Sequence, residues 1–273
     1  MRFQSAKRRV QKGLEQWLFK HHQRLKRVLP NRYFVFNYPG GRIHWNPGNS
    51  PGMMARILGI YEIDKITAVQ KLLKPGSTFV DIGANVGDYT LLAASLVGNA
   101  GRVLSFEPEP RNRGWLQQSI DLNGYKNIDV FPVALSDGEG EASLYLGEIA
   151  GYHTLIPGHP ERQAGTITVK TRTLDSYLHE LGREHVDMMK IDVEGAEMQV
   201  LRGARTTLGK NPNMILFLEI HPDVGVDPEE VRSFLGQFGF SESGPFWTSN
   251  SGKTCSGEQS LESRLFVPAQ RDF

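Results

Sequence analysis

The sequence predicts an α/β fold built on a mainly parallel sheet with helices on both faces. From Thr78 onward, short apolar runs alternate with segments of helical period, which is typical of strand–helix–strand units. The first run ends in the glycine-rich stretch FVDIGANVGDYT, residues 79–90. We predict strands at 78–83, 102–107, 128–134, 187–192 and 213–220, and helices at 88–97, 111–123, 173–181, 196–208 and 228–238.

The segments around this core predict a two-part organisation. Residues 1–54 hold an apolar stripe at helical spacing, ended by Pro30, and a hairpin pattern around Pro39-Gly40-Gly41. Residues 55–273 form the main domain, beginning with a helical stretch within 59–76. An insertion at 138–172 holds two alternating strand patterns around a long loop, which we expect to lie over the site. The tail predicts a closing hairpin joined by a polar loop.

Composition limits the class of protein. The chain has 273 residues, an ordinary apolar fraction of 39% and one cysteine, so no intrachain disulfide can form. No apolar run approaches the roughly 20 residues that span a bilayer, and no secretory signal is evident. We therefore expect a cytoplasmic protein.

Charge is divided unevenly along the chain. Residues 1–32 hold ten basic residues and one acid, whereas the remaining residues hold 21 basic residues and 29 acids. A basic amphipathic helix of this kind suits peripheral contact with anionic lipid at the inner membrane surface. Packing of the same stripe against the domain or a second subunit is the equal alternative, and oligomeric state stays open.

The glycine-rich stretch has the spacing D-x-G-x-x-x-G, which is related to the dinucleotide fingerprint but differs from it. A carboxylate directly before the glycines, at Asp81, would repel a diphosphate but suits a ligand that carries an ammonium and a sulfonium. Glu107 follows Gly87 by 20 residues and ends the next strand, where an acid binds a ribose diol. Together with a small loop after the third strand, where adenine can rest, these features indicate S-adenosylmethionine. The predicted cofactor-binding residues are Asp81, Gly83, Ala84, Asn85, Gly87, Thr90, Glu107, Ala134, Leu135, Asp137 and Asp192.

Four stretches, FVDIGANVGDYT, FEPEP, VALSD and MKIDVEGAEMQVLRGA, occur in this order. In order and spacing they resemble the FkbM family of S-adenosylmethionine-dependent methyltransferases, over roughly residues 55–240. The resemblance implies a Rossmann-like, seven-stranded sheet with a reversed last strand. It also implies methylation of hydroxyl oxygens on sugars, glycolipids or other natural products.

Methyl transfer to a hydroxyl needs a positioned oxygen and a group that takes its proton. The fourth and fifth predicted strands end in acids and a histidine, and Glu219 and His221 fall on one face because side chains repeat every two residues. His221 can take a proton near neutral pH. The predicted catalytic residues are His221, Asp192 and Glu219. Glu194 and Glu197 lie nearby, and Lys190 is expected to pair or to extend toward solvent. Tyr152 and His153 of the insertion are further candidates for contact with the acceptor.

Two alternatives concern the chemistry. Asp192, Glu194, Glu219 and His221 also have the character of a magnesium site, although we predict no required metal. An NAD-dependent oxidoreductase is disfavoured by Asp81 and by the missing G-x-G-x-x-G. A membrane-associated, non-catalytic cofactor-binding protein is disfavoured by the full set of acids at strand ends. A nucleic-acid acceptor is not expected, because DVEGAE replaces the turn used by amino-methylating enzymes and the body is acidic. The expected acceptor is a small molecule or a lipid-linked glycan.

Overall fold

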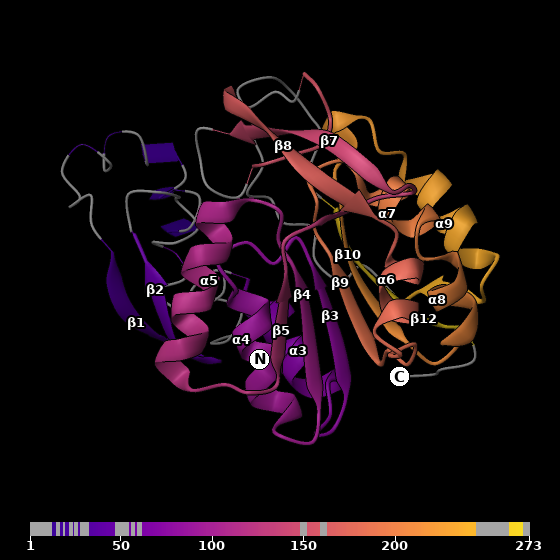
Figure 1. Ribbon diagram of the computed structural model, residues 1–273, viewed down its shortest axis with the longest axis horizontal. Helices are drawn as coiled ribbons and strands as arrows, with labels where there is room; N and C mark the ends of the chain where they lie inside the picture. The colour runs from indigo at the N-terminus through magenta and orange to yellow at the C-terminus, as the bar shows by residue number, and fades with distance from the viewer. Residues whose placement is uncertain are drawn as a thin grey trace.

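The computed structural model describes residues 33–46, 62–147, 152–158, 163–243 and 262–269, with ten separate positions before residue 62. Its centre is a seven-stranded sheet in the order β11-β12-β10-β9-β3-β4-β5 (Figure 1). Five strands run parallel: β3 (Thr78–Ile82), β4 (Arg102–Phe106), β5 (Ile128–Phe131), β9 (Met188–Ile191) and β10 (Ile215–Ile220). The predicted α/β class is confirmed.

The last strand of the chain is the reversed one. β12 (Glu262–Pro268) pairs antiparallel with both β10 and β11 (Phe240–Glu242), so the predicted closing hairpin and the reversed last strand are both present. The loop predicted between them, residues 244–261, lies outside the described residues. Strand order reverses between β3 and β9, which is where an open α/β sheet forms its ligand crevice.

Helices bury the apolar side chains of both sheet faces. One face packs against α6 (Leu174–Glu180), α7 (Glu197–Arg202), α8 (Arg205–Lys210) and α9 (Pro228–Gly236). The other packs against α3 (Ile63–Leu72) and α4 (Asp88–Val97). The continuous apolar runs of the central strands follow from burial on both faces. This double cover fixes the strand ends that carry the candidate site.

The predicted N-terminal hairpin consists of β1 (Phe34–Tyr38) and β2 (Gly41–Trp45), paired antiparallel. It lies beside α5 (Pro110–Asn123) in Figure 1. Ile43 and Trp45 are fully buried in a cluster that also holds Leu91, Leu116 and Ile120. A Cβ at Gly40 would collide with the α4 backbone, so the hairpin turn sits directly on the main domain.

The insertion forms a second, three-stranded sheet across the end of the parallel strands (Figure 1). β7 (Gly140–Gly147) and β8 (Gln163–Arg172) pair antiparallel, as expected, and β6 (Ala134–Leu135) adds to β8 in parallel. Of the loop between β7 and β8, residues 152–158 are described. A short 3-10 turn, η1 (Pro222–Val224), follows β10.

Two predicted elements are wrong in extent. The strand expected at 128–134 stops at Phe131, because Pro132 has no backbone N–H to continue a ladder, and the chain then joins the insertion sheet as β6. The helix expected at 196–208 is two helices that break at Gly203. The Asp175 carboxylate accepts the backbone N–H of Thr206 and Thr207 and so caps the start of α8.

Candidate active site

A hollow lies at the carboxyl edge of the sheet, beside the reversal of strand order. It opens to solvent, and the empty space within it and its mouth is about 620 Å³. Six of the predicted cofactor residues line it: Gly83, Asn85, Glu107, Ala134, Leu135 and Asp192. The other lining residues are Ile82, Phe106, Pro108, Asn112, Val133, Leu144, His153, Leu155, Val193, Glu194 and Ala196.

The glycine loop is shaped by contacts within the chain as well as by the hollow. Gly83 has φ +75°, and a Cβ there would collide with the carbonyl oxygen of Asp192. Gly87 has φ +99°, and a Cβ there would collide with Leu116 on α5. Both positions therefore need glycine for loop packing, which spacing alone does not reveal.

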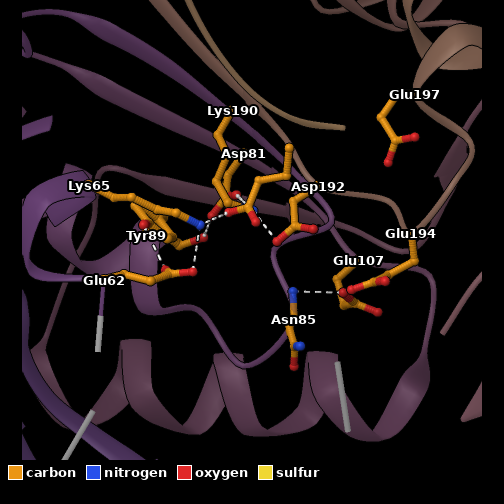
Figure 2. Close-up of polar contacts among 12 residues, drawn as sticks. Glu62, Lys65, Asp81, Asn85, Tyr89, Glu107, Lys190, Asp192, Glu194 and Glu197 are labelled. Atoms are coloured by element: carbon orange, nitrogen blue, oxygen red, sulfur yellow. Dashed lines mark hydrogen bonds and ion pairs between the residues drawn. The ribbon is translucent and has the colours of Figure 1, made fainter. Parts of the chain in front are cut away.

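Glu107 is held at the mouth of this loop by backbone donors. Its Oε2 accepts from Asn85 N at 2.7 Å (Figure 2). Its Oε1 accepts from Glu109 N at 2.8 Å. Burial raises the pKa of Glu107 to about 7, and the two backbone hydrogen bonds oppose that rise. Each carboxylate oxygen keeps a further lone pair for a ligand hydroxyl.

Asp81 lies beneath the hollow and is not among its lining residues. Its Oδ2 accepts from Thr90 Oγ1 at 2.6 Å, and its Oδ1 lies 3.8 Å from Lys190 Nζ. Burial raises the pKa of Asp81, while the Lys190 ammonium opposes the rise. Asp81 and Thr90 thus support the loop from below.

The remaining predicted cofactor residues divide by position. Ala134 and Leu135 lie in β6 and line the hollow, whereas Asp137 is exposed and does not line it. Ala84 is 5% exposed and packs in the cluster between α4 and α5. Of the stretch VALSD, Val133, Ala134 and Leu135 therefore line the hollow, and Asp137 does not.

His221 stands at the centre of a cluster of acids next to the hollow. Its Nδ1 lies 2.7 Å from Glu197 Oε1, and its Nε2 lies 3.3 Å from Glu194 Oε2 and 4.0 Å from Asp192 Oδ1. Glu197, the first residue of α7, also accepts from Gly195 N. Glu197 therefore does more than favour the helix dipole, because it orients the imidazole.

The acids make His221 a cation at neutral pH. Burial lowers the pKa of His221, but the carboxylates of Glu194 and Glu197 outweigh it and hold the pKa well above its ordinary value. Burial raises the pKa of Asp192, yet the ammonium of Lys190 at 3.2 Å and the imidazole of His221 bring it below its ordinary value. The cluster therefore offers one ionised carboxylate, Asp192, directly at the hollow.

Glu219 belongs to a different set of contacts. Its carboxylate lies 2.8 Å from the ammonium of Lys65, which also lies 2.7 Å from Glu62 (Figure 2). Tyr89 donates its hydroxyl to Glu62 at 2.9 Å. Burial raises the pKa of Glu219 to about 7, and Lys65 opposes the rise. Lys65 was missed by the sequence analysis, because an isolated lysine in an amphipathic helix looks like a solvent-exposed residue.

Three ligand-type side chains come together around His221. One atom each of Asp192, Glu194 and His221 lies within 4.8 Å of the others, a spacing that a metal ion could use. Glu219, the fourth member of the expected magnesium set, is not in this group. Lys190 and the imidazolium of His221 already supply positive charge there.

Comparison with known proteins agrees with this architecture. The model of the FkbM methyltransferase domain matches residues 81–242. Hexuronic acid methyltransferase AglP of Haloferax volcanii is 29% identical over 157 residues, covering 58% of this chain and 60% of AglP. 2-O-methyltransferase NoeI of Sinorhizobium fredii is 30% identical over 158 residues, covering 52% of this chain and 63% of NoeI. The chain thus spans less than two thirds of the length of either relative.

A solved structure of methyltransferase FkbM from Methylobacillus flagellatus has a TM-score of 0.47 and 14% identity, covering 74% of this chain and 50% of that one. The fold and the site together define a Rossmann-like methyltransferase domain. The chain belongs to the FkbM methyltransferase family, as its motifs indicated.

The N-terminal arm falls largely outside the described residues. At its described positions, Trp17 is 48% exposed and stacks on His21, whereas Leu18 is buried. Among the helices that the structure describes, none is long and apolar enough to cross a membrane.

Proposed function

We propose that this chain is an S-adenosylmethionine-dependent O-methyltransferase that acts on a hydroxyl of a sugar, glycolipid or other natural product. The observation that carries the proposal is Glu107, which is fixed by two backbone amides at the carboxyl end of β4 and lines the hollow. Membership of the FkbM family supports methyl transfer. The names of AglP and NoeI support a carbohydrate hydroxyl as the acceptor.

The residues of the hollow fit the cofactor. Glu107 would accept hydrogen bonds from the ribose diol, and Pro108, Ala134 and Leu135 provide apolar surface for adenine. Asn85 also lines the hollow, and its buried Oδ1 has no hydrogen-bond partner within the described part of the chain. A buried acceptor of this kind favours a ligand that brings a donor.

When bound, the cofactor supplies a methyl group on a sulfonium, ready for in-line displacement by the acceptor oxygen. The chain must orient that oxygen and take its proton. Asp192 is the ionised carboxylate at the hollow, so we propose that Asp192 takes the proton of the acceptor hydroxyl. His221 is already charged, so it orients Asp192 and Glu194 and stabilises the negative charge of Asp192. Glu219 contacts Lys65, so we propose that Glu219 is a positioning residue that holds Lys65 in place.

No metal is needed in this scheme. The positive charge that a magnesium ion would provide beside the acceptor is supplied by His221 and Lys190, each within reach of Asp192. Magnesium bound by Asp192, Glu194 and His221 is the alternative.

A binding experiment tests the cofactor first. Thermal unfolding should shift upward with S-adenosylhomocysteine and not with NAD, because a ligand that binds the native state stabilises it. A shift with NAD alone would overturn the assignment in favour of an oxidoreductase. A labelled methyl donor should then be screened against hexuronic-acid glycans, activated sugars and glycolipids. Binding without turnover on any acceptor would favour the non-catalytic alternative.

A lipid-linked acceptor would explain the basic arm. Leu14 and Trp17 expose apolar side chains, and ten basic residues lie within residues 1–32. We propose salt-sensitive binding to anionic vesicles through residues 1–30, and a cytoplasmic location at the inner membrane surface. Equal vesicle binding by the chain lacking residues 1–30 would contradict this role, and vesicles of neutral lipid are the control.

A further inference from the structure

Part of the lining of the hollow is built by the insertion. Leu144 of β7 and His153 and Leu155 of the segment 152–158 line the same hollow as Glu107 and Asn112. Leu144 and Leu155 pack with Ala134 of β6, which also lines the hollow. The cofactor motifs of the sequence do not include this part of the lining, because they lie at the ends of the parallel strands.

The backbone of segment 152–158 is held in place by contacts on both sides of His153. Thr154 exchanges two backbone hydrogen bonds with Tyr145 of β7, at 2.8 and 3.1 Å. The Thr154 hydroxyl donates to the carbonyl of Glu194 at 2.6 Å and accepts from Ile156 N at 3.0 Å. On the other side, a Cβ at Gly147 would collide with Tyr152, so the strand end and the segment are in close contact. His153 is thus carried by a fixed backbone.

The tautomer of His153 follows from one contact. Gly147 N donates to His153 Nδ1 at 3.1 Å, so Nδ1 must carry a lone pair. A neutral imidazole that accepts at Nδ1 has its proton on Nε2 and can donate there. Burial lowers the pKa of His153, the nearby Glu109 opposing and Arg111 adding to the effect, which keeps the ring neutral.

The neighbours of His153 place it beside the N-terminal end of α5. Glu109 and Arg111 lie near enough to shift the pKa of its imidazole, and Asn112 of the same helix lines the hollow with it. When ionised, Glu107 offers only acceptors to a ligand, which suits ribose hydroxyls. A nucleoside also presents acceptor atoms, on the purine ring nitrogens and the ribose ring oxygen, and these need a donor.

We propose that His153 is a cofactor-binding residue that donates a hydrogen bond from Nε2 to an acceptor atom of the nucleoside, not to the methyl acceptor. This inference rests on the proposed function and extends it, because it makes the insertion part of the cofactor site. The Thr154 contact with Glu194 then joins the cofactor wall to the acid cluster through one residue.

The test is titration calorimetry of the full chain with S-adenosylhomocysteine, without a methyl acceptor. His153→Ala and His153→Phe should each raise Kd about 10-fold, which is about 1.4 kcal/mol and lies within the range for one neutral hydrogen bond, and ring packing survives in Phe. His153→Gln, whose amide N–H reaches the Nε2 position, should stay within about 3-fold of the parent. His185→Ala, at an exposed histidine away from the hollow, is the matched control and should bind like the parent.

Outcomes separate this inference from the proposed function. If the parent binds S-adenosylhomocysteine and the Ala and Phe variants bind equally well, His153 is not a cofactor residue, whereas the proposed function stands. If only the KM of a methyl acceptor changes, His153 belongs to the acceptor side and the inference is wrong. If the parent does not bind, the proposed function itself fails. Thermal unfolding without ligand shows whether each variant is folded. If His153→Ala is not folded, the comparison of His153→Phe with His153→Gln tests the inference instead.

Discussion

The two halves of the site neutralise buried carboxylates in different ways. On the cofactor side, Glu107 is met by neutral backbone donors from residues 85 and 109, and its pKa rises to about 7. On the acid side, Asp192 is met by charged side chains, Lys190 and His221, and its pKa falls. Backbone amides orient a carboxylate without removing the cost of burying its charge, whereas cations offset that cost.

The difference teaches what each half can do. A carboxylate that is fixed but easily protonated suits hydrogen bonding to a neutral diol. A carboxylate that stays ionised beside cations suits taking a proton and handling charge. The second half also depends on partners from distant segments, since Lys65 and Glu219 are 154 residues apart in sequence. Substitutions that remove one kind of partner should therefore have distinct effects.

The largest expected effect is on stability, from Lys65→Met. The Lys65 side chain is 3% exposed and its ammonium lies between Glu62 and Glu219, so its loss removes the cation that contacts both buried carboxylates. Breaking a buried pair in this way costs about 3–5 kcal/mol, measured as the free energy of unfolding in urea. Lys71→Met, on the exposed face of the same helix, is the control and should change little.

A second substitution sharpens that prediction. Adding Glu219→Gln to Lys65→Met should recover part of the lost stability, because one of the two buried carboxylates that lost Lys65 becomes a neutral amide. If the single variant unfolds at the parent's urea concentration, the buried network does not stabilise the acid side as described.

The next effect is on turnover, from Asp192→Asn and His221→Ala. Each should lower kcat by about 10²-fold or more, because the proton acceptor or the group that orients it is lost. The affinity of the His221 variant for S-adenosylhomocysteine should change little. Near-normal rates in both variants would move the chemistry elsewhere, most directly to the insertion.

Chelation accompanies this measurement. In our scheme EDTA leaves the rate unchanged. A rate lost in EDTA and restored by magnesium would instead make Asp192, Glu194 and His221 a metal site.

A smaller effect is expected on cofactor affinity. Glu107→Ala should weaken S-adenosylhomocysteine binding by about 1.5–3 kcal/mol, the range for hydrogen bonds to a charged group. Asp81→Ala should also weaken it, but by less, because Asp81 acts through Thr90 and Lys190 and does not line the hollow. If calorimetry shows that both variants bind S-adenosylhomocysteine as tightly as the parent, the hollow is not the cofactor site.

The smallest effect is a pH dependence of that affinity. Because the pKa of Glu107 is about 7, most of the free protein carries a neutral Glu107 at pH 6 and an ionised one at pH 8. A ligand that binds the ionised form should therefore bind about 10-fold more weakly at pH 6 than at pH 8. Glu107→Gln isolates this group, since its affinity should lack that 10-fold change. An identical pH dependence in the Gln variant would assign the titration to another residue.

Sequence by itself determined the parts of this protein whose signal is local. Alternating apolar runs predicted the parallel core, and the tail pattern predicted the antiparallel closing strands that the structure contains. Strand-end position brought Gly83, Glu107 and Asp192 to one hollow, because the carboxyl ends of parallel strands meet at one edge. The breaks at Pro132 and Gly203 were missed, although both residues were visible, because the apolar pattern continues across them.

Tertiary structure alone decided the partners. Spacing places Glu219 and His221 on one face of the strand. In the folded chain, however, Glu219 pairs with Lys65 of α3 and His221 contacts Glu197 of α7. Asp137 lies two residues after the end of β6, but the turn of the chain leaves it exposed. His153 joins the hollow only because the insertion folds back over it. Charge pairing and burial depend on distance in space, and no local pattern records which distant segment will supply the neighbouring side chain.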